Sequence, residues 1–141
     1  MKITNVVSHI LIAAGEWQTG RFEFIDLMDR GKVDVAQPDV GNVGGLTEER
    51  RVCHLAEDRG RIIVPHCWKT GIGIAASAHL AAVTPHCPFI EFLPAELTDS
   101  QLRQDLVKED LQIIDGKVAV PDKPGLGIEL DMDALKRFEQ D

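Results

Sequence analysis

The sequence contains no tyrosine, and its phenylalanine and tryptophan residues make up only 5% of 141 residues. Surfaces that bind single-stranded nucleic acid depend on such rings for base stacking. Basic residues are also outnumbered, since Lys and Arg total 15 against 23 Asp and Glu, which gives a net charge of -8. A protein that binds a duplex needs a basic face to displace counterions. We therefore expect no nucleic-acid partner.

Cysteine is scarce, and long apolar runs are missing. The three cysteines, Cys53, Cys67 and Cys87, show no Cys-x-x-Cys spacing, which is typical of reduced thiols in a cytoplasm. No run reaches the roughly 18 apolar residues of a membrane span. The opening MKITNVVSHILIAAGEW is interrupted at Ser8 and His9, which disfavours a signal peptide. We expect a cytoplasmic protein with no membrane partner.

Short apolar segments alternate with helix-like segments in the first 97 residues. Strands are predicted at 9–14 (HILIAA), 32–40 (KVDVAQPDV), 61–64 (RIIV) and 88–93 (PFIEFL). Helices are predicted between them: one capped by Thr19, one capped by Thr47, and one over 71–83. The first helix has the apolar members Phe22, Ile25, Leu27 and Met28. This alternation is typical of parallel βαβ units in an α/β fold with about four strands.

The pattern changes after about Leu97. A short helix is predicted over 100–107, and 111–120 reads as a hairpin in which Asp115-Gly116 forms a type I′ turn. A last amphipathic helix is predicted over 133–140. We divide the chain into a partial barrel, residues 1–97, and a C-terminal extension, residues 98–141.

Each of the four predicted strands is followed by, or ends in, a residue able to do acid–base or metal chemistry: Glu16, Asp39, His66 and Glu91. In parallel α/β folds, ligands bind outside the carboxyl ends of the strands. We therefore expect these four side chains to meet at one rim of the sheet.

Each of the four has a plainer interpretation when taken alone. His66 could be a structural histidine at a strand end, and Asp39 could only shape a turn after a proline. Glu16 could be a solvated loop carboxylate or an acidic group near the start of the helix capped at Thr19. Glu91 could lie on a solvated face of its strand. The joint pattern favours a functional site.

Other candidates are weaker. His54 and His79 fall on predicted helices, His86 lies in a loop before Pro88, and His9 is not part of the pattern at the strand ends. A Cys67–His66 nucleophile is disfavoured because adjacent residues on a strand point apart. GNVGG, residues 41–45, is a poor phosphate-binding signal without the dinucleotide spacing.

Five stretches carry a family resemblance: AAGEW, DVAQPDVGNVGGLTE, RIIVPHCWKTGIG, FIEFLP and KPGLGIEL. In this order and spacing they resemble the C-terminal half of the barrel domain in the mandelate racemase/muconate lactonizing branch of the enolase superfamily. Within that branch these motifs are most similar to those of the acid-sugar dehydratases. The resemblance implies part of a TIM-like (β/α)₇β barrel that binds Mg²⁺ at three carboxylates on successive strand ends.

The resemblance also implies roles for the four residues. Glu16 matches the third metal ligand, Asp39 and His66 match an Asp–His dyad, and Glu91 matches a glutamate that hydrogen-bonds the substrate carboxylate and its enolate. Metal and acid would stabilise the charge left when imidazole removes a proton next to a carboxylate. Loss of a β-hydroxyl as water then makes the reaction a dehydration of a sugar acid. Two further residues just past His66, Trp68 and Lys69, could contact that substrate.

The family's first two metal carboxylates, its lysine-bearing strand and its capping domain would all precede Glu16. One carboxylate does not hold Mg²⁺ tightly. We therefore expect a fragment or truncated form of a dehydratase-like enzyme that binds Mg²⁺ weakly or not at all and is inactive alone. The alternatives are a non-catalytic binding or assembly module, or a racemase or isomerase of the same superfamily. Because four parallel strands leave open edges, we also expect a homo-oligomer.

Overall fold

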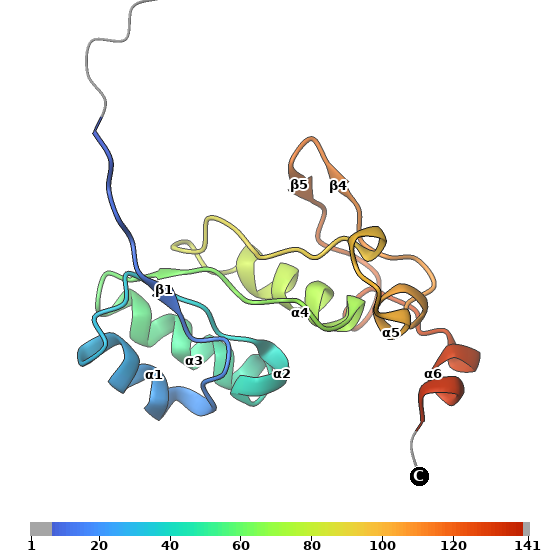
Figure 1. The fold of residues 1–141 in the computed structure, drawn as a ribbon, viewed down its shortest axis with the longest axis horizontal. Helices are drawn as coiled ribbons and strands as arrows, with labels where there is room; N and C mark the ends of the chain where they lie inside the picture. Colours follow the sequence, from blue (N-terminus) through green and yellow to red (C-terminus); the bar gives the residue numbers. More distant parts are fainter. Residues whose placement is uncertain (1–6, 140–141) are drawn as a thin grey trace, which may run out of the picture.

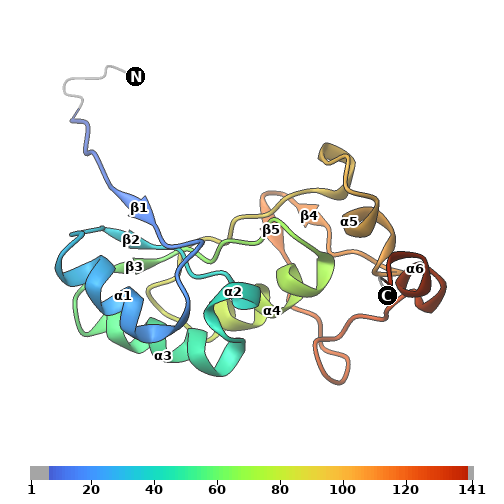
Figure 2. The same ribbon diagram turned by 60° about the horizontal axis from the view of Figure 1, so that its bottom comes forward.

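A computed structural model of the chain describes residues 7–139. Its sheet consists of three short parallel strands in the order β1-β2-β3: β1 at Ala13–Ala14, β2 at Val35–Ala36 and β3 at Ile62–Ile63. Figure 1 labels β1, and Figure 2 labels all three strands. Helices connect the strands, as parallel pairing requires. The predicted α/β class, with parallel strands of a partial barrel, is confirmed.

Two helices pack on the sheet. Figure 2 shows α1 (Gly20–Asp29) and α3 (Leu46–Glu57) together on one side of the strands. Their buried side chains, with those of the strands and the following helix, form the core: Phe24, Met28, Val33, Ala36, Val43, Val52, Cys53, Ala56, Ile63 and Leu80. The short α2 (Val40–Val43) and α4 (Gly71–Ala82) follow β2 and β3, so both helices begin close to the carboxyl ends of these strands.

Two details of the helices differ from the prediction. Phe22 is 76% exposed, whereas Phe24 is fully buried. Residues advance about 100° each around a helix, so two positions reverse the face, and Phe24 shares its face with Met28 four residues on. Helix α3 begins at Leu46 with Gly45 as its N-cap, so Thr47 lies inside the first turn and is not the cap.

The fourth strand was predicted wrongly, because residues 88–93 form no strand in the described chain. Alternate residues of a parallel strand turn their N–H groups to opposite neighbours. The N–H groups of Val64 and His66 donate to the β2 side, and that of Ile63 donates to the carbonyl of His86. Pro65 holds the next position facing residues 88–93 and has no N–H, so the ladder stops there. A single bond from Glu91 N–H to the Pro65 carbonyl, 3.0 Å long, ties this segment down.

The C-terminal extension holds the elements expected there. Helix α5 spans Gln101–Asp105, strands β4 (Ile113–Ile114) and β5 (Lys117–Val118) form an antiparallel hairpin, and α6 spans Met132–Phe138. A 3₁₀ turn at Ala95–Leu97 precedes them. The turn residues of the hairpin both have positive φ, 51° at Asp115 and 72° at Gly116, as a type I′ turn requires.

The extension is attached by a buried arginine. Arg103 is 1% exposed, donates from Nε and Nη2 to the Leu93 carbonyl, and pairs through Nη2 with Asp110 Oδ2 at 2.7 Å. A buried guanidinium is stable only when its charge is paired. Arg103 therefore fixes the end of the segment that carries Glu91.

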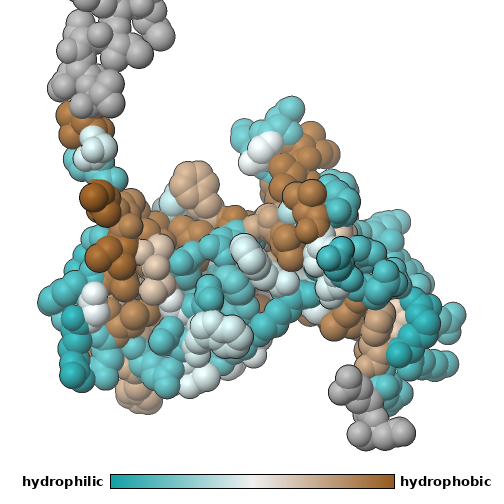
Figure 3. All heavy atoms as spheres, viewed as in Figure 1, coloured by the Kyte–Doolittle hydropathy of each residue, from teal (hydrophilic) through white to brown (hydrophobic). Residues whose placement is uncertain are grey.

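Much apolar surface stays uncovered near the first strand and the hairpin. Figure 3 shows apolar side chains along the N-terminal segment that leads into β1 and on the β4–β5 hairpin. Ile10 is 92% exposed and Ile114 is 70% exposed. Only Ala13–Ala14 of the predicted first strand pair as a strand. No helix within residues 7–139 is long and apolar enough to cross a membrane.

Two parts of the sequence interpretation fall on terminal residues. The opening run, which we interpreted as unlike a signal peptide, includes residues 1–6. The predicted last helix reaches residue 140. Residues 1–6 and 140–141 lie outside the described residues.

Candidate active site

The four residues that follow the predicted strands meet at one rim. Glu16 comes two residues after β1, Asp39 follows β2, and His66 follows β3. Asp39 and His66 form a parallel backbone bridge, so the ladder between the two strands continues to the site. The bond from Glu91 N–H to the carbonyl of Pro65 brings the fourth residue beside His66. The predicted gathering of these side chains is thus present in the structure.

Asp39 and His66 form a hydrogen-bonded pair. Asp39 Oδ2 lies 2.9 Å from His66 Nδ1, and Asp39 Oδ1 accepts from Gly41 N–H at 2.8 Å. Asp39 is only 3% exposed and is also the N-cap of α2. A carboxylate fixed in this way accepts the Nδ1 proton of a neutral imidazole, which leaves the Nε2 lone pair free. The pair therefore has the arrangement of a base and the group that orients it.

Two carboxylates face the free nitrogen of that imidazole. His66 Nε2 lies 3.8 Å from Glu16 Oε2 and 3.9 Å from Glu91 Oε2. These distances exceed hydrogen-bonding range, so neither carboxylate occupies the Nε2 lone pair. The two carboxylates therefore converge on the free nitrogen of His66 without bonding to it.

Two neutral side chains complete the site, and the sequence analysis missed both. Gln37 Nε2 donates to Glu91 Oε1 at 2.6 Å. Asn42 Nδ2 donates to the Glu16 carbonyl at 2.7 Å, and Asn42 Oδ1 accepts from Lys69 Nζ at 2.5 Å. Carboxamides have no charge and no metal preference that would single them out in a sequence. Their closeness to Asp39 within QPDVGN was the only available signal.

Trp68 and Lys69 both lie next to the dyad. The Trp68 ring stacks on that of His66 with centroids 5.7 Å apart, and Trp68 is 59% exposed. Lys69 Nζ is 3.7 Å from Asp39 Oδ1. A hollow of about 360 Å³ adjoins these groups and is lined by Asp39, Val40, Gly41, Leu46, His66, Cys67, Lys69, Thr70, Ile72, Gly73, Ala76 and Leu126.

The site does not supply a complete metal centre. Within residues 7–139, no group of three or more His, Cys, Asp or Glu side chains could hold a metal ion. Glu16 is 48% exposed along its side chain and is the one predicted metal ligand. Magnesium requires a near-octahedral oxygen set. The described residues therefore do not fit Mg²⁺ by themselves.

The cysteine thiols are unsuited to nucleophilic chemistry. Burial raises the pKa of Cys67 to about 12, and its Sγ donates to the Pro65 carbonyl at 3.6 Å. Burial likewise raises the pKa of Cys53 to about 12 and that of Cys87 to about 11. Since the thiolate is the reactive form, these groups stay inert near neutral pH. The high pKa of Cys67 agrees with the sequence-based prediction that Cys67 and His66 do not form a nucleophilic pair.

Two of the remaining histidines have structural contacts. His79 Nε2 lies 3.2 Å from the Leu126 carbonyl, and His86 Nε2 lies 3.0 Å from the Cys53 carbonyl. His79 thereby ties the PGLG segment, which lines the hollow, to α4.

A buried acid lies close to the dyad. Glu49 on α3 is fully buried, and neither of its carboxyl oxygens has a hydrogen-bond partner. Burial, followed by the charge of Asp39, raises the pKa of Glu49 to about 8. Glu49 is therefore mostly a neutral acid at pH 7, and its electrostatic neighbours include Asp39, Cys53, Cys67 and Cys87.

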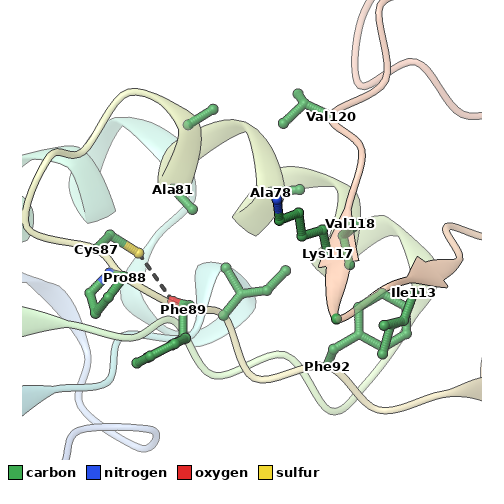
Figure 4. Close-up of a pocket in the computed structure, with 13 residues that line it drawn as sticks. Ala78, Ala81, Cys87, Pro88, Phe89, Phe92, Ile113, Lys117, Val118 and Val120 are labelled. Atoms are coloured by element: carbon green, nitrogen blue, oxygen red, sulfur yellow. Dashed lines mark hydrogen bonds between the residues drawn. The ribbon is translucent and has the colours of Figure 1, made fainter.

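A second cavity of about 420 Å³ lies away from this chemistry. Figure 4 shows its apolar walls, which come from α4, the segment around Phe89 and Phe92, and the β4–β5 hairpin with Val118. The Cys87 thiol donates to the Phe89 carbonyl at 3.2 Å beside it. None of the four rim residues lines this cavity.

The chain is an α/β protein with the parallel strands of a partial barrel and an Asp–His pair at the carboxyl ends of those strands. Residues 2–134 match the model of the family described as enolase C-terminal domain-like. The chain belongs to this family.

Its relatives include enzymes named for acid sugars. It is 39% identical over 137 residues to a D-galactarolactone cycloisomerase of Agrobacterium fabrum, and 34% identical over 138 residues to a D-galactonate dehydratase of Xanthomonas oryzae pv. oryzae. These matches cover 92% and 93% of this chain. Among solved structures, the 3,6-anhydro-D-galactonate cycloisomerase of Zobellia galactanivorans superposes with a TM-score of 0.81 at 36% identity, covering 92% of this chain and 36% of that one. The chain spans 35% of the length of each of the two curated relatives.

Proposed function

We propose that this chain supplies the proton-abstracting half of a site that acts on a sugar acid, in an enzyme of the dehydratase or cycloisomerase kind. One observation carries the proposal: Asp39 Oδ2 holds His66 Nδ1 at 2.9 Å, and the free Nε2 faces Glu16 and Glu91. The names of the relatives, which refer to galactonate and galactarolactone, support the substrate class.

The residues of this chain suit the steps of a dehydration. His66 Nε2 takes the proton from the carbon next to the substrate carboxylate, and the electron pair of that C–H bond moves into the carboxyl group as an enediolate. Asp39 stabilises the resulting imidazolium through Nδ1. Glu91 hydrogen-bonds the substrate carboxylate and its enolate. When the enediolate collapses, the β-carbon–oxygen bond breaks, and the hydroxyl leaves as water with the proton from His66.

Magnesium enters this proposal only as a partner of the complete site. When bound, a divalent metal would neutralise charge on the enediolate oxygens. We assign Glu16 as the one ligand that the described residues offer, with Lys69 and Trp68 as substrate contacts. The proposed action of Asp39 and His66 follows from a contact within this chain.

The exposed apolar surface supports a proposal about assembly. Strand β1 pairs only with β2 within the described residues, and Ile10, Leu11 and Ile12 beside it are 92%, 58% and 55% exposed. Open edges of this kind promote pairing with another chain. We propose that the isolated chain forms a homo-oligomer. Sedimentation velocity at micromolar concentration should show a species of at least two chains, and a compact monomer there would contradict the proposal.

Proton exchange at carbon tests the chemistry without requiring the full reaction. The chain is incubated in D₂O with D-galactonate and Mg²⁺, and NMR follows loss of the proton next to the carboxylate. Because the described residues offer a single metal ligand, we expect the wild-type chain to exchange this proton only slowly and without completing the dehydration. The slow exchange should stop with His66→Asn, whereas His54→Asn, which changes an exposed histidine on α3, should behave as wild type. Equal signals from wild type and His66→Asn would overturn the proposal.

The second candidate function is a non-catalytic binding module of the same fold. The incomplete set of metal ligands within residues 7–139 favours it. Binding of D-galactonate without any His66-dependent exchange would support this alternative. Exchange with return of the proton and no loss of water would indicate a racemase or isomerase.

A further inference from the structure

Gln37 is bonded to Glu91 at the rim and takes no part in the steps of dehydration described above. Its backbone is fixed, because its N–H donates to the Ala14 carbonyl at 3.0 Å in the ladder between β1 and β2. Gln37 and Asp39 are two residues apart in extended backbone, so their side chains lie on the same face. Asp39 meets His66, and Gln37 meets Glu91 through a 2.6 Å bond from Nε2 to Oε1.

The two oxygens of Glu91 are consequently unequal. Oε1 accepts from Gln37, whereas Oε2 is buried, has no hydrogen-bond partner and lies 3.9 Å from His66 Nε2. A carboxamide nitrogen only donates, so a proton on Oε1 would meet another donor. Any proton that Glu91 carries must therefore sit on Oε2. Buried polar atoms nearly always have a hydrogen-bond partner, so the unpaired Oε2 is a candidate to bond a ligand.

We propose that Gln37 is a positioning residue: it holds Oε1 of Glu91 so that Oε2 alone is presented, beside His66, to the oxygen of a bound carboxylate substrate. This inference rests on the proposed function, because it takes Glu91 as the group that meets the substrate. Without Gln37, the terminal torsion of Glu91 is broad and nearly two-fold, so both oxygens would sample the position.

The bond itself can be tested without a substrate. In the ¹⁵N-labelled full chain, the side-chain NH₂ signals of Gln37, assigned by their loss in Gln37→Leu, should be split widely because one proton is bonded to a carboxylate. Glu91→Leu should collapse this splitting. Glu96→Leu, which removes an exposed glutamate five residues away, should leave it unchanged. Signals that do not respond to Glu91→Leu would overturn the inference.

Affinity for D-galactonate tests the positioning role. We expect Gln37→Leu to weaken binding at pH 7.5 by about tenfold, the factor that corresponds to about 1.4 kcal/mol. Gln101→Leu, an exposed glutamine on α5, should bind as wild type. Gln37→Glu should bind more weakly still at pH 7.5, where two carboxylates repel, and should recover to about threefold of wild type at pH 5, where the introduced carboxyl can carry a proton and donate as Gln37 does.

Each ratio is taken against wild type at the same pH, because His66, Glu16, Asp39 and Lys69 also face the site. Recovery at low pH separates positioning from a structural role, since packing damage would persist at both pH values. Wild-type affinity in Gln37→Leu with an unchanged fold would overturn the inference. If wild type binds no D-galactonate, the proposed function fails, and the amide signals alone then decide whether Gln37 holds Glu91.

Discussion

Asp39 and His66 stand 27 residues apart in the chain and are joined twice, once by a parallel backbone bridge and once by the 2.9 Å contact between Oδ2 and Nδ1. The backbone bridge sets the distance between the two Cα positions, and the carboxylate then sets the orientation of the ring. The side-chain geometry of the candidate base therefore depends on the sheet, and disturbing either residue should have separable effects on stability and on the state of the imidazole.

Asp39→Asn should change the imidazole more than the fold. Asparagine is as good an N-cap as aspartate, so its side-chain oxygen can still accept from Gly41 N–H. The charge-assisted bond to Nδ1 is lost, which should lower the free energy of unfolding by about 2 kcal/mol. Long-range ¹H–¹⁵N spectra should show His66 losing its preference for the Nδ1–H tautomer. Asp26→Asn, on the exposed face of α1, is the control, and an unchanged tautomer in Asp39→Asn would contradict the dyad.

Glu49 should make the protein less stable as the pH rises from about 4.5 to about 8. Its folded-state pKa of about 8 exceeds the ordinary value of 4.5. Between these values the folded chain keeps a proton that the unfolded chain has released, so the unfolding free energy falls with pH and levels off above about 8. The total change should be up to about 5 kcal/mol, at 1.36 kcal/mol for each pH unit.

Urea denaturation at pH 5, 6.5 and 8 measures this. Glu49→Met, which removes the acid and keeps the side chain long and apolar, should gain stability relative to wild type as the pH rises. Glu57→Met changes an exposed glutamate on the same helix and should show the wild-type pH dependence. Parallel curves for wild type and Glu49→Met would show that Glu49 is ionised in the folded chain.

Arg103→Met should destabilise the chain by about 3 to 5 kcal/mol, because Asp110 is then left as a poorly solvated charge and the Leu93 carbonyl loses both donors. The double variant Arg103→Met/Asp110→Leu should lose less than the sum of the two single changes. A double-mutant cycle in urea measures this coupling. Additive losses would mean that the pair does not act as a unit.

Phe24→Ala and Phe22→Ala form a matched pair. Phe24 is fully buried between the helices and the sheet, and its loss should cost about 3 to 5 kcal/mol. Phe22 is 76% exposed, so its loss should change stability by less than about 0.5 kcal/mol. Thermal unfolding of both variants checks the order, and a larger loss for Phe22→Ala would mean that α1 packs by its other face.

The fourth strand and the faces of the helices show where sequence patterns are insufficient. The apolar run at 88–93 has the composition of a strand, yet strand formation also requires a neighbour with free N–H groups, and Pro65 of the adjacent segment lacks one. Phe22 and Phe24 are the same residue type two positions apart, and only the packing of α1 on the sheet distinguishes them. The type I′ turn at Asp115-Gly116 was predictable because it depends on local backbone preferences alone.

The sequence by itself determined the order of the three parallel strands and of the helices α1, α3 and α4, the turn at Asp115-Gly116, and the set Glu16, Asp39, His66 and Glu91. These depend on composition, on local propensity and on where each apolar run ends. Only the tertiary structure decided that Gln37 hydrogen-bonds one oxygen of Glu91, that the buried Glu49 has no hydrogen-bond partner, and that neither neighbouring carboxylate hydrogen-bonds His66 Nε2. Such contacts join residues distant in the chain, and their geometry follows from how the elements pack.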